Sequence, residues 1–236
     1  MQQPASITAE PAALAGSPCE TFRALEKYLI GSGLGSDLAP FEVIRSRLIT
    51  PPTLTPEDFA KETFYVILAS GFSQKTAKRI WAEIVHYYEA RGGSTVCFDD
   101  LFAVFHNRNK INAILQVWQN RAVYCGEFYA RPNAEEKIKY LATLPHIGKI
   151  TAHHLARNLG ISVVKYDVWI QRLALACAGK KGGPSFPIRP EVIRACDILF
   201  SKLEQATGHP KGYIDVVLWK SCQLGLIHLP ERAKDT

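Results

Sequence analysis

The sequence has 236 residues and a mass of 26.3 kDa; 47% of the residues are apolar, 21% are charged, and the formal net charge is +6. These values are typical of a soluble globular protein with one large or two small domains, and they exclude collagen-like, intrinsically disordered and disulfide-scaffold proteins. No uncharged apolar run approaches the roughly 20 residues that span a bilayer, and the first basic residue is Arg23, so we expect neither a membrane partner nor a basic targeting segment. A cytoplasmic, nucleoid-associated protein is expected from a bacterial source, and a nuclear protein from a eukaryotic one.

The first 19 residues are rich in Ala, Pro, Gln and Ser and have no apolar period, so we expect residues 1–19 to be a disordered leader. Beyond them, apolar residues recur at intervals of three and four, which is typical of amphipathic helices. The clearest such segments are 77–88, 111–125, 170–177 and 192–203. The short alternating run 161–164 is too isolated to form a sheet, and Gly and Pro breaks leave about ten helices, so the sequence predicts an all-α protein.

The six cysteines are widely spaced and contain no CxxC pair, which argues against a structural zinc site and against a secreted disulfide framework. We expect reduced thiols, most of them in the core.

The positive charge is concentrated in one part of the chain. Residues 131–190 contain ten basic side chains and three acidic ones. A local excess of this size suits a polyanion such as a nucleic-acid backbone. A solvated basic surface would have the same composition, so the charge alone does not decide between the two.

Residues 138–159 form a helix-hairpin-helix pattern, in which two short helical stripes flank the connection Leu144–Gly148. Pro145 ends the first helix, and Gly148 gives the backbone freedom to turn. The first amides of the second helix then lie beside Lys149, which is a favourable site for a phosphate group. A hairpin that only packs against the rest of the protein remains the alternative.

Asp167 opens the helical segment 168–177 and is the single acidic residue between Glu136 and Glu191. An Asp at this position is a good N-cap, worth about 1 kcal/mol. A carboxylate on a surface that binds DNA repels its ligand, so we expect a second role as well. It can stabilise a developing positive charge or activate a water molecule.

The segment 144–152, followed by Asp167, resembles the signature of the helix-hairpin-helix (HhH-GPD) DNA glycosylases, and most of all those similar to endonuclease III and the 8-oxoguanine glycosylases. The resemblance extends to residues 66–73 and 213–219. It implies an all-α, two-lobed fold in which one lobe joins residues 20–54 to 164–236. The other lobe is a helical barrel at 55–163 that contains the hairpin, and the hairpin lies at the cleft between the lobes.

The resemblance also implies roles for individual residues in the removal of a base that has been flipped out of lesion-containing double-stranded DNA. Asp167 is the expected catalytic residue. The expected DNA-binding residues are Pro145, His146, Ile147, Gly148, Lys149, Thr151, Lys165, Gly71, Phe72 and Ser73. The expected base pocket contains Ile150, Trp169, Tyr213 and Trp219. Backbone carbonyls of Leu144 and Ile147 are candidate ligands of a structural sodium or potassium ion.

The sequence departs from the family at one position that decides the chemistry. Bifunctional members place a nucleophilic lysine two residues after the last glycine of the hairpin, and here that position is Ile150, which has no lone pair. We therefore expect a monofunctional glycosylase that uses water and acts as a monomer. The alternatives are a glycosylase and lyase that uses Lys149, and a non-catalytic DNA-binding module.

An iron–sulfur cluster, which some members carry near the C-terminus, is not expected, because only Cys196 and Cys222 lie beyond residue 190. The sequence does not identify the base that is removed.

Overall fold

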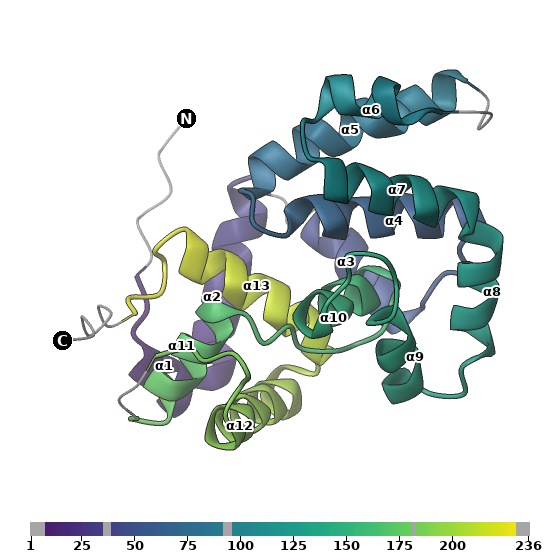
Figure 1. Ribbon diagram of the computed structural model, residues 1–236. Helices are drawn as coiled ribbons and strands as arrows, with labels where there is room; N and C mark the ends of the chain where they lie inside the picture. The colour runs from purple at the N-terminus through teal and green to yellow at the C-terminus, as the bar shows by residue number, and fades with distance from the viewer. Residues whose placement is uncertain (1–7, 35–38, 92–95, 181–182, 230–236) are drawn as a thin grey trace. The chain divides into compact units, whose positions relative to one another are not determined.

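The computed structural model describes residues 8–34, 39–91, 96–180 and 183–229. Within these ranges the chain forms thirteen helices and no β-strand, and an isolated bridge pairs Ala9 with Ile227 (Figure 1). The prediction of an all-α protein is confirmed. No helix in the described ranges is both long enough and apolar enough to cross a membrane.

The chain divides into two compact units, of which the first contains residues 1–50 and 162–236 and the second contains residues 51–161.

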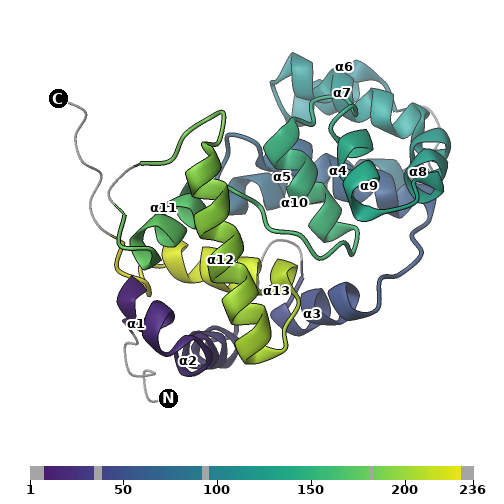
Figure 2. The same cartoon turned by 90° about the horizontal axis from the view of Figure 1, so that it is seen from below.

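The first unit is built from six helices around one hydrophobic core. These are α1 (Pro11–Gly16), α2 (Pro18–Gly31), α3 (Phe41–Ile49), α11 (Val168–Cys177), α12 (Pro190–Thr207) and α13 (Lys211–Gln223). Helices α11, α12 and α13 pack against one another, and α2 packs against both α12 and α13 (Figure 2). Helix α13 is buried on nearly every side. It therefore forms the centre of this unit.

The expected disordered leader is wrong for residues 8–19. Pro11 and Pro18 stand at the starts of α1 and α2, where a missing amide hydrogen costs nothing. Leu14 is completely buried, and the backbone of Ala9 exchanges hydrogen bonds with Leu226 (2.8 Å) and His228 (3.0 Å). Apolar burial and backbone pairing therefore order this segment, while residues 1–7 lie outside the described part of the chain.

The second unit contains seven consecutive helices. These are α4 (Pro56–Ala69), α5 (Gln74–Ala90), α6 (Phe98–Val104), α7 (Arg108–Gln119), α8 (Arg121–Ala130), α9 (Ala134–Leu141) and α10 (Lys149–Asn158). Helix α4 is its central element, because α5, α7, α8 and α10 all pack against it and eight of its residues are buried.

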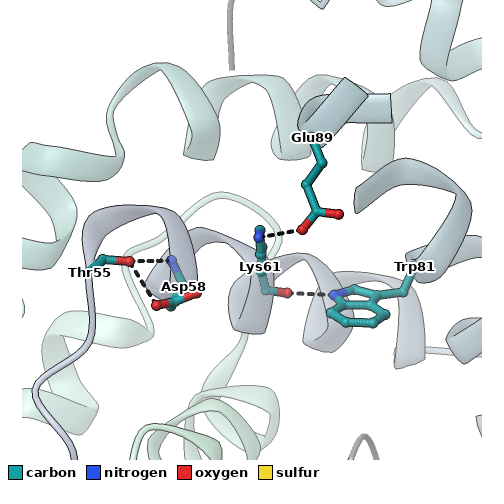
Figure 3. A network of polar contacts seen from close by, with 5 residues as sticks. All are labelled: Thr55, Asp58, Lys61, Trp81 and Glu89. Carbon is teal, nitrogen blue, oxygen red and sulfur yellow. Dashed lines mark hydrogen bonds and ion pairs between the residues drawn. The ribbon is translucent and has the colours of Figure 1, made fainter. Parts of the chain in front are cut away.

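Polar contacts fix the start of α4 and its packing on α5 (Figure 3). The Thr55 hydroxyl caps α4 by accepting a hydrogen bond from the Asp58 amide at 3.1 Å. Lys61 forms an ion pair with Glu89 at 2.8 Å, and its carbonyl accepts a hydrogen bond from the Trp81 indole at 2.8 Å. The ion pair and the indole hydrogen bond join α4 to α5.

The buried position of Leu14 predicts that α1 contributes to stability. Replacement of Leu14 by Ala removes a fully buried side chain and should lower the free energy of unfolding by about 2–5 kcal/mol. Chemical denaturation of the two proteins measures the difference. The control is Ala12→Ser at an exposed position of the same helix, where we expect a change within about 0.5 kcal/mol. Equal stability of Leu14→Ala and the wild type would mean that α1 does not pack on the core.

Candidate functional site

The hairpin between α9 and α10 is closed by backbone and side-chain hydrogen bonds. The Ile147 amide donates to the Leu144 carbonyl at 3.1 Å, and both side chains are buried, which anchors the turn in the second unit. The Gly148 amide donates to the Thr151 hydroxyl at 2.7 Å, and this hydroxyl donates to the Gly148 carbonyl at 3.0 Å. Thr151 therefore fixes the first turn of α10 from inside the helix.

The start of α10 retains the features of an anion site. Gly148 is the N-cap, and the first helical hydrogen bond runs from the Ala152 amide to the Gly148 carbonyl at 2.8 Å. The amides of the three residues between them have no acceptor one turn earlier in the helix. Lys149 is exposed beside them. A phosphate group at this position would meet both the amides and an ammonium group.

His146 has a φ of 62°, and it is the only non-glycine residue with a positive φ in the described ranges. This left-handed conformation costs an L-residue roughly 1–2 kcal/mol. Partial burial of the ring lowers the pKa of His146 below its ordinary value, and the charge of Lys110 lowers it further. The lowered pKa favours the neutral imidazole, and the turn carries a strained backbone.

The loop between α4 and α5 presents an aromatic side chain. Gly71 has a φ of 80°, which glycine adopts without strain, and Ser73 caps α5 by accepting a hydrogen bond from the Thr76 amide at 3.2 Å. Between them, Phe72 is 41% exposed and packs edge-on against Phe105, with 5.5 Å between the ring centroids. The loop thus holds an exposed ring between two fixed ends.

Asp167 is the N-cap of α11. Its Oδ1 accepts hydrogen bonds from the amides of Trp169 (3.0 Å) and Ile170 (3.2 Å). Its Oδ2 lies 3.6 Å from the ammonium group of Lys165, and 15% of the side chain is exposed. One oxygen therefore fixes the orientation of the carboxylate, and the side chain keeps partial access to solvent.

Two of the expected base-pocket residues of the first unit, Trp169 and Trp219, are partly exposed. Trp169 follows Asp167 by two residues, and both Trp169 and Trp219 are partly buried against the core of this unit. The Lys165 ammonium lies 6.0 Å from the centroid of the Trp219 ring. Burial raises the pKa of the Cys196 thiol to about 12, with Asp167 among the carboxylates that raise it further. The carboxylate therefore lies at the edge of the apolar core.

Tyr213 does not line a pocket, and this expectation is corrected. Its side chain is completely buried in the core of the first unit, and its hydroxyl donates to Glu26 at 2.6 Å. Its ring also packs against Phe22 and His209. Helix α13 is buried around its whole circumference at this point, so Tyr213 has no exposed face to offer a ligand.

The candidate residues fall into two groups. The second unit contains the hairpin, Ile150 in the first turn of α10, and the loop 71–73, whereas the first unit contains Lys165, Asp167, Trp169 and Trp219. Sequence reasoning missed Lys110, whose side chain is buried beneath the loop 71–73. In the described ranges, no three His, Cys, Asp or Glu side chains lie close enough together to hold a metal ion.

Two solved structures share the all-α fold of this chain: the 8-oxoguanine DNA glycosylases of Methanocaldococcus jannaschii and Thermotoga maritima. The first has a TM-score of 0.63 and 18% identity over 87% of this chain and 94% of its own. The second has a TM-score of 0.62 and 19% identity over 87% of this chain and 97% of its own.

No protein-family model matches the chain, and no curated protein matches it in sequence. At identities below 20% the structural likeness establishes the fold alone, and the chain shares the expected all-α fold with these two proteins.

The strain at His146 leads to a prediction about stability. Replacement by Gly relieves the left-handed conformation, while it also increases the entropy of the unfolded chain. We expect the free energy of unfolding to rise by up to about 1 kcal/mol, measured by urea denaturation. His146→Ala is the matched control, because Ala keeps the strain and should give no such gain. A loss of stability in both variants would show that contacts of the imidazole outweigh the strain.

Proposed function

We propose that this protein is a DNA glycosylase of base excision repair, which removes a damaged, modified or mispaired base from duplex DNA by hydrolysis. The observation that carries the proposal is the carboxylate of Asp167, oriented by two backbone amides and still partly open to solvent. The fold, shared with two 8-oxoguanine DNA glycosylases, supports it.

In this proposal the hairpin binds the phosphate backbone without reading the sequence. The first amides of α10 and the ammonium group of Lys149 would contact one phosphate group, because both offer hydrogen bonds to an anion. Phe72 would enter the space that the flipped nucleotide leaves and would stack on a neighbouring base. Both contacts come from the second unit.

Asp167 would act on the flipped nucleotide. As the glycosidic bond breaks, positive charge develops on the sugar, and a fixed carboxylate stabilises that charge without having to reorient. The same group can orient the water molecule that attacks the sugar. Lys165 would contact the phosphate next to the flipped nucleotide. The positive charge of Lys165 would then be shared between the Asp167 carboxylate and the DNA.

We propose a monofunctional enzyme, because Ile150 occupies the position of the nucleophilic lysine and its side chain forms no Schiff base. Lys149 precedes Ile150 in the first turn of α10, and adjacent helical residues point about 100° apart. The Lys149 ammonium would therefore be directed at phosphate.

A sodium or potassium ion fits the hairpin, because the Leu144 carbonyl accepts one hydrogen bond in the turn and keeps a second lone pair. The carbonyls of Leu144 and Ile147 would hold this ion, whose charge would assist phosphate binding.

The first prediction of this proposal concerns Asp167→Asn. Asn is also a good N-cap, so the fold should be retained, whereas base release should fall by about 10²–10³-fold. The measurement is base release from duplexes that contain oxidised, alkylated, deaminated or mispaired bases, with 8-oxoguanine as the first base tested, followed by alkaline strand cleavage. The matched control is Asp99→Asn, which removes an exposed carboxylate from α6 in the second unit and should leave base release unchanged. Unchanged release in Asp167→Asn with intact DNA binding would favour the non-catalytic module.

The second prediction concerns strand cleavage. Wild-type protein should leave an abasic site that is cleaved only after alkali, and borohydride should trap no covalent complex, because no lysine occupies the nucleophile position. Lys149→Ala should weaken DNA binding at low salt without changing the nature of the product. A trapped complex that Lys149→Ala abolishes would instead identify a lyase that uses Lys149.

A further inference from the structure

Lys110 is a buried lysine. It lies in the first turn of α7, the residue is only 4% exposed, and its contacts within the described part of the chain are with two carbonyls and an aromatic ring. Burial of an ammonium group is costly unless hydrogen bonds replace its water. The contacts that replace this water therefore indicate what the residue does.

The Lys110 ammonium caps the C-terminus of α4. It donates one hydrogen bond to the Leu68 carbonyl at 3.2 Å and a second, short one to the Ser70 carbonyl. Carbonyls at the end of a helix lack helical partners and carry the negative end of the helix dipole, so a cation is favourable there. This cap determines where α4 ends and where the loop 71–73 begins.

The same ammonium group also supports the ring of Phe72. Its Nζ lies 4.6 Å from the centroid of that ring, and the edge of Phe105 packs on it at 5.5 Å between centroids. Cation–π and edge-to-face contacts each favour one orientation of the ring. Phe72 is therefore held in place although 41% of the residue is exposed.

Lys110 is also electrostatically linked to the hairpin. Its charge lowers the pKa of His146, and burial lowers the pKa of Lys110 itself to about 8. The ammonium group thus lies near both loops of the second unit that we propose to contact DNA.

We propose that Lys110 is a positioning residue that fixes the loop 71–73, so that Phe72 enters the base stack as a preorganised wedge. This inference rests on the proposed contact between Phe72 and duplex DNA. Unstacking of a base step costs a few kcal/mol. A ring that is already held in its inserting orientation loses no further conformational entropy when it binds. Lys110 touches neither base nor sugar and acts through Phe72.

A double-mutant cycle tests the inference without base removal. The probe is a duplex with 2-aminopurine beside a tetrahydrofuran abasic analogue, which the protein cannot cleave, and its fluorescence reports unstacking at saturating protein. Lys110→Met removes the charge and the donors, and we expect the unstacking equilibrium constant to fall about tenfold. Phe72→Ala should lower it at least as much, and the double variant should be no worse than Phe72→Ala alone.

Two further variants separate positioning from general stability. Lys61→Met removes a lysine of α4 that is paired with Glu89, so it should lower the unfolding temperature while unstacking stays at the wild-type level. Lys110→Gln is shorter and uncharged, and it replaces Lys110→Met in the cycle if that variant does not fold.

Independent, multiplicative losses in the cycle would overturn the inference, as would wild-type unstacking in Lys110→Met or the absence of unstacking by the wild type. Failure of the proposed function is a separate result, because it is seen as the absence of base release from every lesion duplex.

Discussion

The pair of hydrogen bonds from the amides of Trp169 and Ile170 to Asp167 is the interaction on which the candidate chemistry depends. It starts α11, one of the helices at the core of the first unit, and it also fixes the direction of the carboxylate. A group that is held by the backbone needs no rearrangement to meet a developing charge. Folding and the proposed catalysis therefore share one side chain, and the second oxygen, beside Lys165, is the one left for chemistry.

The second unit holds two loops at defined positions, namely the loop 71–73 and the hairpin between α9 and α10. In both loops a side chain caps the end of a helix: Thr151 closes the start of α10, Ser73 caps α5, and Lys110 caps the end of α4. Each cap satisfies groups that the helix itself cannot satisfy. Phe72 and His146 are the exposed residues of these loops that the sequence led us to expect in contact with DNA.

The sequence predicted the helices with a long apolar period and the hairpin, because these patterns depend on local spacing alone. It did not reveal α1, since six residues are too few to show a period, nor the break at Asn120 that divides the stripe 111–125 into α7 and α8. Tyr213 was misplaced because α13 buries polar as well as apolar residues, so its sequence does not show which face meets solvent. Lys110 follows Arg108 in an ordinary polar stretch, and only tertiary packing buries it.

The bridge between Ala9 and Ile227 has a consequence for synthesis on the ribosome. Because domains generally fold as units as the chain emerges, the second unit, continuous from residue 51 to 161, can become native while the ribosome is still translating. The first unit must wait, since its early helices, with the apolar surface of α2 and α3, lack their partners until α13 has left the exit tunnel.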